Sequence, residues 1–255
     1  MNDTAPVVEH NECYENDMAG IGIRDGARPI IRSNKCYKNT MAGIGSDGSS
    51  PLIVGNECHE NLMAGIGLQG NTVAVVQNNT CVENKLVAIG ITQGSTATIT
   101  GNRLMRTGGV PPTIAVKEGS DASIYNNDIL GGGVAALLVQ GTTTVRGNRF
   151  SGAGEKQGNA VWVWEGSSAT IVSNSFDGYR AAINASGSEI VAIKNTIRDF
   201  RGPAIVVRNG SMPAHIADNT AFSKDQASVV VAVQGPEGVV ANNTLKLLRD
   251  SEGQE

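Results

Sequence analysis

The sequence lacks most of the features that mark the commoner classes of protein. Aromatic residues make up 4% of it and charged residues 17%, with no run of lysines or arginines. The net charge of −4 gives the chain no basic surface to draw it to nucleic acid. No apolar stretch is long enough to span a bilayer, and there is no signal-peptide start. We therefore expect no nucleic-acid partner and no membrane insertion. The compartment stays open, because the chain also fits a piece of a longer, secreted or cell-surface protein.

Cysteine is scarce as well, with 4 residues in a chain of 255. A disulfide framework would need a higher density. Steps of 23, 22 and 23 residues separate Cys13, Cys36, Cys58 and Cys81. If they stack at a repeat spacing of about 4.8 Å, their Cβ atoms stay too far apart for disulfides and their side chains do not converge on a metal. We predict free, buried thiols, and no metal or other cofactor.

The sequence is rich in glycine, with 32 glycines in all, and it contains an internal repeat. The segment Ala-Gly-Ile-Gly at residues 19–22 returns at 42–45 and at 64–67. An asparagine recurs at the same period of about 23 residues. Its positions are Asn11, Asn34, Asn56, Asn79, Asn102, Asn127, Asn148, Asn174, Asn195, Asn219 and Asn243. A second asparagine column, predicted to be a structural ladder like the first, comprises Asn16, Asn39, Asn61 and Asn84.

Each period carries short stretches in which apolar residues alternate with polar or small ones, which is the pattern of β-strands. Turn residues such as Asp25-Gly26 and Gly94-Ser95 separate them. Three short strands in about 23 residues leave no room for a helix, so the repeat predicts an all-β parallel β-helix. A leucine-rich repeat is the structural alternative, but its second half should be helical and leucine-bearing, whereas here it is glycine-rich and β-branched.

The element Asn-x-Cys-x-x-Asn at residues 34–39, followed by residues 42–45 and by Pro51-Leu52-Ile53, resembles the right-handed parallel β-helix repeat family. These are also called carbohydrate-binding and sugar-hydrolase repeats, within the pectate-lyase-like superfamily. The resemblance covers nearly the whole chain. It implies a right-handed solenoid of about 10–11 coils with three short strands per coil of about 23 residues. Relatives of this kind include polysaccharide lyases, hydrolases and uronate epimerases.

We expect a single β-helix domain over residues 1–249 and a polar tail over 250–255. The pattern begins in mid-coil, so we expect a cap domain, a partner or a second copy at the N-terminal end. At the other end, Leu245-Lys246-Leu247-Leu248 is predicted to be a short cap.

The predicted outward positions of the main strand in the first four repeats form a smooth strip, at Gly20, Gly22, Gly43, Gly45, Gly65, Gly67, Ala88 and Gly90. On a second strand, Ile30, Leu52 and Val75 are predicted to point outward, with Val54 beside them. Exposed aliphatic residues in a row indicate a covered surface, with a missing segment or a second copy as the expected cover.

Trp162 and Trp164 are two residues apart on one predicted strand, so both should face outward and offer flat rings for stacking on sugars. Two long loops, 106–113 and 151–159 (the second with Glu155 and Lys156), precede strands of this region. Together they predict a ligand-binding site that also includes Lys117, Gln140 and Arg208. The alternative is that the loops cover the tryptophans and the charges are merely solvated.

Catalytic residues are harder to find. Glu118 and Glu165 lie two coils apart, roughly 9.5 Å, which suits an inverting carboxylate pair only loosely. No histidine stands beside an evident acid partner. The favoured interpretation is a non-catalytic protein that recognises a glycan or a protein through its outer strand face and the loops 106–113 and 151–159. The alternatives are a lyase, hydrolase or epimerase acting on an acidic sugar polymer, and a structural solenoid that self-associates.

Overall fold

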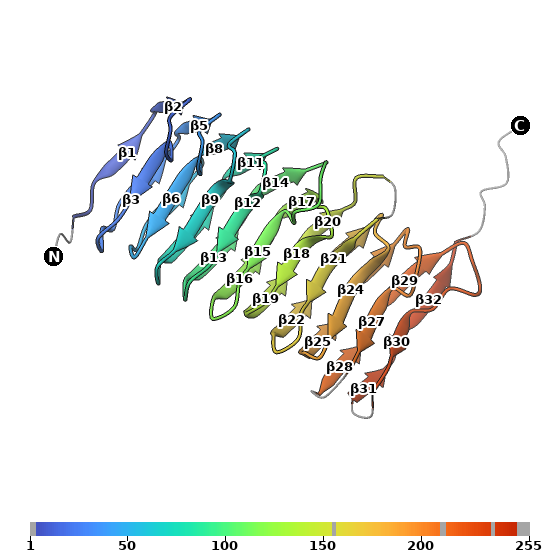
Figure 1. Cartoon of the computed structure of the whole chain (residues 1–255). Coiled ribbons are helices and arrows are strands. Elements are labelled where there is room, and N and C mark those ends of the chain that lie inside the picture. The colour runs from blue at the N-terminus through green and yellow to red at the C-terminus, as the bar shows by residue number, and fades with distance from the viewer. Residues whose placement is uncertain (1–3, 155–156, 210–212, 236–237, 249–255) are drawn as a thin grey trace, which may run out of the picture.

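The computed structural model describes residues 4–154, 157–209, 213–235 and 238–248. Glu155, Lys156 and the predicted tail 250–255 lie outside these ranges. The described chain winds into a parallel β-helix in which strands and turns are the only secondary structure. Successive coils stack along one axis, with β1 and β32 at opposite ends (Figure 1). Three parallel sheets of 11, 11 and 10 strands run the length of this described part of the chain.

The first sheet, called sheet A here, contains β1 (Val7–Glu9), β4 (Ile30–Arg32), β7 (Leu52–Val54), β10 (Val73–Gln77), β13 (Thr96–Thr100), β16 (Asp121–Tyr125), β19 (Thr142–Arg146), β22 (Ser168–Val172), β25 (Glu189–Ile193), β28 (Ala214–Ala217) and β31 (Gly238–Ala241). Sheet B contains β2 (Glu12–Tyr14), β5 (Lys35–Tyr37), β8 (Glu57–His59), β11 (Thr80–Val82), β14 (Arg103–Arg106), β17 (Asp128–Gly131), β20 (Arg149–Ser151), β23 (Ser175–Asp177), β26 (Thr196–Arg198), β29 (Thr220–Ser223) and β32 (Thr244–Leu247). Sheet C contains β3 (Ile21–Ile23), β6 (Ile44–Asp47), β9 (Ala64–Gln69), β12 (Val87–Ile91), β15 (Ile114–Val116), β18 (Ala135–Val139), β21 (Asn159–Val163), β24 (Ala181–Ser186), β27 (Ile205–Arg208) and β30 (Val231–Val233).

Each strand pairs in parallel with its counterparts in the coils before and after it, so like residues of the repeat lie on top of one another. Ile44, for example, pairs in register with Ile21 and Ile66. Side chains alternate between the inside and the outside of a strand, and the inward ones form continuous columns of apolar residues. Ile44 and Ile66 are both fully buried. The predicted fold, with its three strands per coil, is confirmed.

Both predicted asparagine ladders are present. Along the first, every side-chain amide from Asn11 to Asn219 donates to the Oδ1 of the next asparagine over 2.8–3.1 Å. The second runs from Asn16 to Asn84 in the same way. Each net hydrogen bond contributes about 1 kcal/mol; the first ladder satisfies backbone groups where the chain bends from sheet A to sheet B, and the second where it bends from sheet B to sheet C.

The four cysteines are free, as predicted. Three are buried in the core column that Leu104 and Ile129 continue, and Cys13 is half-buried. A hydrogen bond that the Cys36 thiol donates to the neighbouring Cys58, together with burial, raises the pKa of Cys36 well above its usual range. The prediction of a C-terminal cap at residues 245–248 is wrong. Residues 244–247 form β32, an ordinary strand of sheet B paired with β29.

Candidate binding cleft on sheet C

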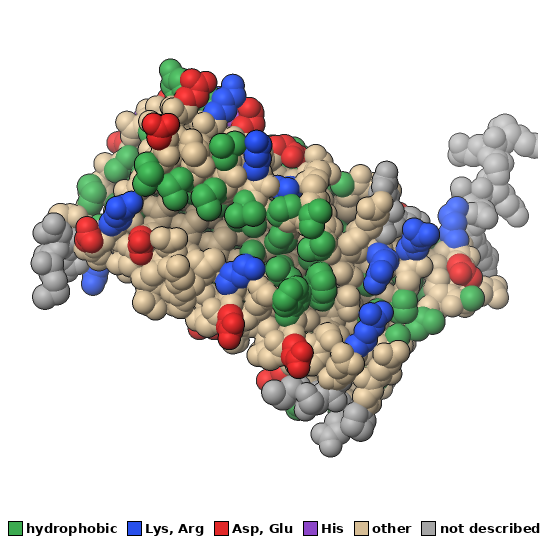
Figure 2. Space-filling view, in the orientation of Figure 1, with side chains coloured by type: hydrophobic (Ala, Val, Ile, Leu, Met, Phe, Trp, Pro, Cys, Tyr) green, Lys and Arg blue, Asp and Glu red, His purple; other side chains and the backbone are tan. Residues whose placement is uncertain are grey.

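The outer face of sheet C carries two hollows, side by side along the axis. Figure 2 shows a row of hydrophobic side chains over the N-terminal coils of this face, and several Lys and Arg side chains over its C-terminal coils. The hollow over the middle and C-terminal coils, which we call the loop cleft, measures about 760 Å³. Its lining comes from Thr107, Gly109, Val110, Gly132, Gly133, Val134, Ala153, Gln157, Gly158, Asn159, Trp162, Tyr179, Arg180, Asn184 and Arg208.

Loop 106–113 borders the cleft because the side chain of Arg106 anchors it. Arg106 replaces the next asparagine of the second ladder, 22 residues after Asn84. Its guanidinium donates to the carbonyls of Asn84 (2.6 Å), Lys85 (2.7 Å) and Pro111 (3.0 Å), and only 6% of the residue is exposed. Burial lowers the pKa of Arg106, but three carbonyl acceptors stabilise its charge. The role of Arg106 is therefore to hold the loop in place.

Glycines and a buried tyrosine bring the neighbouring segments together below this loop. A Cβ on Gly133 would lie 2.0 Å from the carbonyl oxygen of Val110, so only glycine lets the backbones approach. The hydroxyl of Tyr179 lies 2.9 Å from the carbonyl oxygens of both Gly131 and Ser151, at the starts of two successive connections into sheet C. Burial raises the pKa of Tyr179 far above its usual range. That hydroxyl is thus a fixed donor that ties the walls of the cleft to each other.

The floor of the cleft is an outward column of sheet C in which Trp162 pairs with Leu138 on one side and Asn184 on the other. Val161 and Val163 are fully buried, so the alternation turns Trp162 outward as predicted. Asn184 is 8% exposed, and its amide makes no hydrogen bond within the described part of the chain. Its amide atoms are not among the fully enclosed polar atoms that lack a partner in the described part of the chain, so water in the cleft can reach them. The floor therefore presents a hydrated amide, with no partner among the described residues, to whatever enters the cleft.

Two arginines complete the lining. Arg180 follows Tyr179 at the entry to β24, and Arg208 ends β27. Both are exposed. Within the described residues the lining contains no Asp, Glu or His. The cleft is consequently positive, with a flat ring and an amide on its floor.

The structure divides the predicted site between the two edges of sheet C. Both loops lead into strands of sheet C, whereas Lys117, Gln140 and Trp164 directly follow strands at the opposite edge, where Arg208 also ends β27. Lys117 donates to the amide oxygen of Gln140 over 2.8 Å and lines the other hollow. Trp162 and Arg208 are the predicted binding residues that the structure places in the loop cleft.

Trp164 is 41% exposed, and its ring centroid lies 5.5 Å from that of Trp162 with the two planes tilted by 58°. Glu118 and Glu165 are exposed in equivalent turns between sheets C and A, and neither lines the cleft. A hydrolytic pair would have to flank the bond that is cleaved. These two carboxylates have no such position relative to the cleft.

Sequence reasoning did not single out Arg180, Tyr179 or Asn184. The signal for Asn184 was available, since it is the one amide in an outward column that otherwise reads Ala115, Leu138, Trp162 and Val206.

Among the described residues, no group of three or more His, Cys, Asp or Glu is placed to hold a metal ion. The same residues include no helix of the length and apolarity that a membrane crossing requires.

The chain belongs to the family of proteins with a right-handed β-helix region, which matches residues 1–104 and 112–247. A search of curated proteins finds no match. An alginate lyase from Paenibacillus sp. str. FPU-7 is similar in structure, with a TM-score of 0.60, 14% identity, and coverage of 88% of this chain and 76% of the lyase. PfbA, a surface adhesin of Streptococcus pneumoniae, gives a TM-score of 0.65 at 13% identity over 93% of this chain and 70% of the adhesin.

A mannuronan C-5 epimerase A-module from Azotobacter vinelandii gives a TM-score of 0.54 at 16% identity, over 95% of this chain and 65% of the module. At such identities the likeness concerns the fold alone. The fold is thus shared by enzymes and by an adhesin, and only the cleft itself can distinguish the two kinds of function in this chain.

Proposed function

We propose that this β-helix is a non-catalytic binding protein whose loop cleft recognises an acidic glycan. The observation that carries the proposal is Asn184, an almost fully buried amide on the cleft floor without a hydrogen-bonding partner among the described residues. Sugar hydroxyls both donate and accept, so they satisfy an amide that the protein leaves unpaired. The ring of Trp162, in the same column, offers an apolar face on which a sugar ring stacks.

The charge of the cleft supports an acidic ligand. Arg180 and Arg208 line it, and the described lining has no carboxylate to neutralise them. A guanidinium binds a carboxylate with two parallel hydrogen bonds, which selects uronate sugars over neutral ones. Two of the structurally similar proteins are named as an alginate lyase and a mannuronan epimerase, which makes a uronate polymer the first ligand to try.

The absence of acid–base groups from the described lining favours binding over catalysis. Hydrolysis needs two carboxylates flanking the bond, and abstraction of a proton needs a base within hydrogen-bond reach of it. The Tyr179 hydroxyl is enclosed between two backbone carbonyls, so it is not free to act as that base. A cleft with this lining binds a sugar chain and leaves it intact.

The proposal is tested by calorimetric titration of the chain with mannuronate oligosaccharides and with neutral oligosaccharides of the same length. We expect saturable binding of the acidic sugar, and a loss of roughly tenfold or more in affinity in Asn184→Ala. Because the amide has no partner in the free protein, Asn184→Ala should unfold at the same denaturant concentration as the wild type or higher.

Arg208→Gln should reduce the preference for the acidic over the neutral sugar. Arg146→Gln, which removes the same charge from exposed β19 on sheet A, is the matched control and should bind like the wild type. Equal affinity for acidic and neutral sugars, or full binding by Asn184→Ala, would contradict the proposal. Binding of a protein surface but of no sugar would assign the cleft to a protein partner instead.

A further inference from the structure

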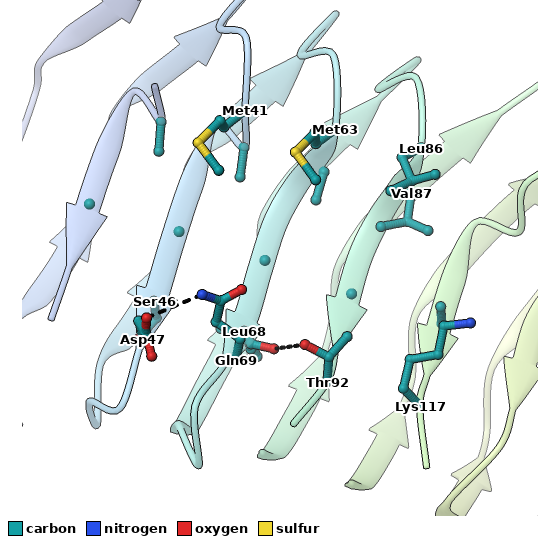
Figure 3. Close-up of a pocket in the computed structure, with 18 of the residues that line it drawn as sticks. Met41, Ser46, Asp47, Met63, Leu68, Gln69, Leu86, Val87, Thr92 and Lys117 are labelled. Atoms are coloured by element: carbon teal, nitrogen blue, oxygen red, sulfur yellow. Dashed lines mark hydrogen bonds between the residues drawn. The ribbon is translucent and has the colours of Figure 1, made fainter. Parts of the chain in front are cut away.

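A second hollow lies on the same face of sheet C, over the N-terminal coils. We call it the glycine groove; it measures about 490 Å³. Its floor includes Gly22, Gly45, Gly67 and Gly90, one from each of four successive coils. Figure 3 shows Met41, Met63 and Leu86 along one side of it, with Asp47, Gln69, Thr92 and Lys117 along the other.

Three of the four floor glycines are not required by the fold. A Cβ on Gly22 would meet nothing within 4 Å, and one on Gly45 or Gly67 would make ordinary contacts of 3.6–3.8 Å with alanine Cβ atoms. None of these glycines adopts a positive φ. Glycine inside a strand costs stability because it loses the most entropy on folding. At Gly22, Gly45 and Gly67 the chain thus carries glycine although a larger residue would fit the fold. A larger side chain at these positions would fill the groove.

The neighbouring glycine column shows the contrast. A Cβ on Gly20, Gly43 or Gly65 would lie only 2.8–2.9 Å from a ladder asparagine amide or from a backbone carbonyl oxygen. Those glycines are explained by the close packing of the coils. The floor column has no such explanation, so its smooth surface points to a ligand that lies against the backbone.

The wall of the groove is apolar and adaptable. Met18, Met41, Met63 and Leu86 stand one per coil just before the strands of sheet C, and 37–54% of each is exposed. Behind them Ala42, Ala64, Val87 and Ala115 form a buried cluster separate from the main core. Methionine is flexible and polarizable, so a row of methionines fits itself to an apolar ligand. An exposed apolar row of this kind marks a binding surface.

Hydrogen-bond accounting restricts the class of ligand. The floor strands β3, β6, β9 and β12 pair with one another in unbroken register, which commits their backbone groups. On the polar side, the Gln69 amide donates to Asp47 over 3.2 Å and the Thr92 hydroxyl donates to the carbonyl of Leu68 over 3.3 Å. The glycine floor and the methionine wall therefore offer no partner to the polar groups of a sugar or an extended peptide, whereas a hydrocarbon chain has none to pair.

Size and charge agree with a hydrocarbon chain that carries one anionic group. From β3 to β15 the groove crosses four coil steps of about 4.8 Å, or roughly 19 Å. A saturated chain of roughly 16 carbons has that length, given C–C bonds of about 1.5 Å. Cations stand at both ends, Arg24 and Lys117. In the described part of the chain, neither is paired with an acid, and Lys117 bonds only the neutral amide of Gln140.

We propose that the glycine groove binds a long-chain fatty acid, with its hydrocarbon tail on the glycine floor against the methionine row and its carboxylate on Lys117 or Arg24. The site is separate from the loop cleft and does not depend on sugar binding. The ligand lies along the coil axis and crosses the strands, because the groove is longest in that direction. A chain lying there removes the exposed methionine row from water.

Calorimetric titration with octanoate, dodecanoate and hexadecanoate, and with the uncharged alcohols of the same lengths, tests the proposal. Affinity should rise roughly two- to fourfold with each methylene up to the length of the groove. The acid should bind roughly tenfold more tightly than the alcohol, a preference that the double substitution Arg24→Gln and Lys117→Gln removes. The double substitution Gly45→Val and Gly67→Val should abolish binding, because its side chains fill the groove.

Thr98→Val is the matched control, an outward position of β13 on sheet A, and should bind like the wild type. If the valine variant fails to fold, Met63→Glu tests the same groove from its exposed wall and should weaken binding at least tenfold. Binding that survives a folded valine variant, or no binding at any chain length, would overturn the proposal. So would a wild-type dimer that the valine variant converts to a monomer, since the occupant would then be a second copy of the chain.

Discussion

Replacing one asparagine in the middle of the first ladder should destabilise the whole solenoid. Asn127 is 2% exposed, and its Oδ1 accepts from the backbone and side-chain nitrogens of Asn102, each over 2.9 Å. Its Nδ2 donates to the carbonyls of Ile99 and Tyr125 and to Asn148 over 2.9–3.0 Å. Asn127→Ala leaves the buried backbone N–H of Asn102 without its acceptor and removes one hydrogen bond each from the Asn102 amide, the Asn148 Oδ1 and the carbonyls of Ile99 and Tyr125. At about 1–3 kcal/mol for the unpaired N–H and about 1 kcal/mol for each other lost bond, reduced by the water that enters, we expect a loss of about 3–5 kcal/mol.

Urea denaturation followed by circular dichroism measures this loss, and tryptophan fluorescence as a second probe shows whether the transition is single. The matched control is Asn243→Ala, at the last rung, where Asn243 is only half-buried and water replaces the lost bonds. The control should cost about 1 kcal/mol. If Asn127→Ala costs no more than Asn243→Ala, the ladder does not stabilise the fold in the way described.

Three further predictions concern single side chains. Gly43→Ala should destabilise the fold by about 1–3 kcal/mol, because its Cβ would lie 2.9 Å from the Gly65 carbonyl oxygen. Gly45→Ala, where the Cβ has room, should be neutral or slightly stabilising. The denaturation midpoints of the two variants test this difference. In the folded protein a thiol reagent should modify Cys13 slowly and the three buried cysteines only on unfolding, and fast labelling of all four would contradict the core packing. The hydrogen bond that Tyr37 donates to Glu12 over 2.9 Å raises the pKa of Tyr37 to about 12. This hydrogen bond therefore stabilises the folded state below the ordinary tyrosine pKa, and the stabilisation is lost as the pH rises from that pKa to about 12. Spectrophotometric titration should show, besides the buried Tyr179, a second late tyrosine that Glu12→Gln returns towards its ordinary range.

The fold was predictable because the repeat in the sequence and the repeat in space are the same. Each strand pairs in register with the equivalent residues of the next coil, so a column such as Cys36 and Cys58 can be read by subtracting residue numbers. Alternation within a strand then decides which side chains point inward. It assigned Val161 and Val163 to the core and Trp162 to the outside, and the structure agrees.

The candidate site was less predictable, because periodicity does not say which edge of a sheet a residue occupies in relation to the loops. Lys117, Trp164 and Arg208 are equivalent positions at the edge away from loops 106–113 and 151–159, yet of the three Arg208 alone lines the loop cleft. Nor does alternation reveal that the amide of Asn184 lacks a partner. That depends on what the neighbouring coils offer within hydrogen-bond distance, which only coordinates supply.

The most direct test of acidic-glycan recognition is tryptophan fluorescence during titration with a uronate oligosaccharide and with the same oligosaccharide after esterification of its carboxylates. Trp162 lies on the cleft floor and Trp164 beside it, so both report on the proposed contact. We predict a saturable change with the free acid, a much weaker one with the ester, and no shorter products in the recovered sugar. No change with either sugar would contradict the binding site, and chain cleavage would contradict its non-catalytic character.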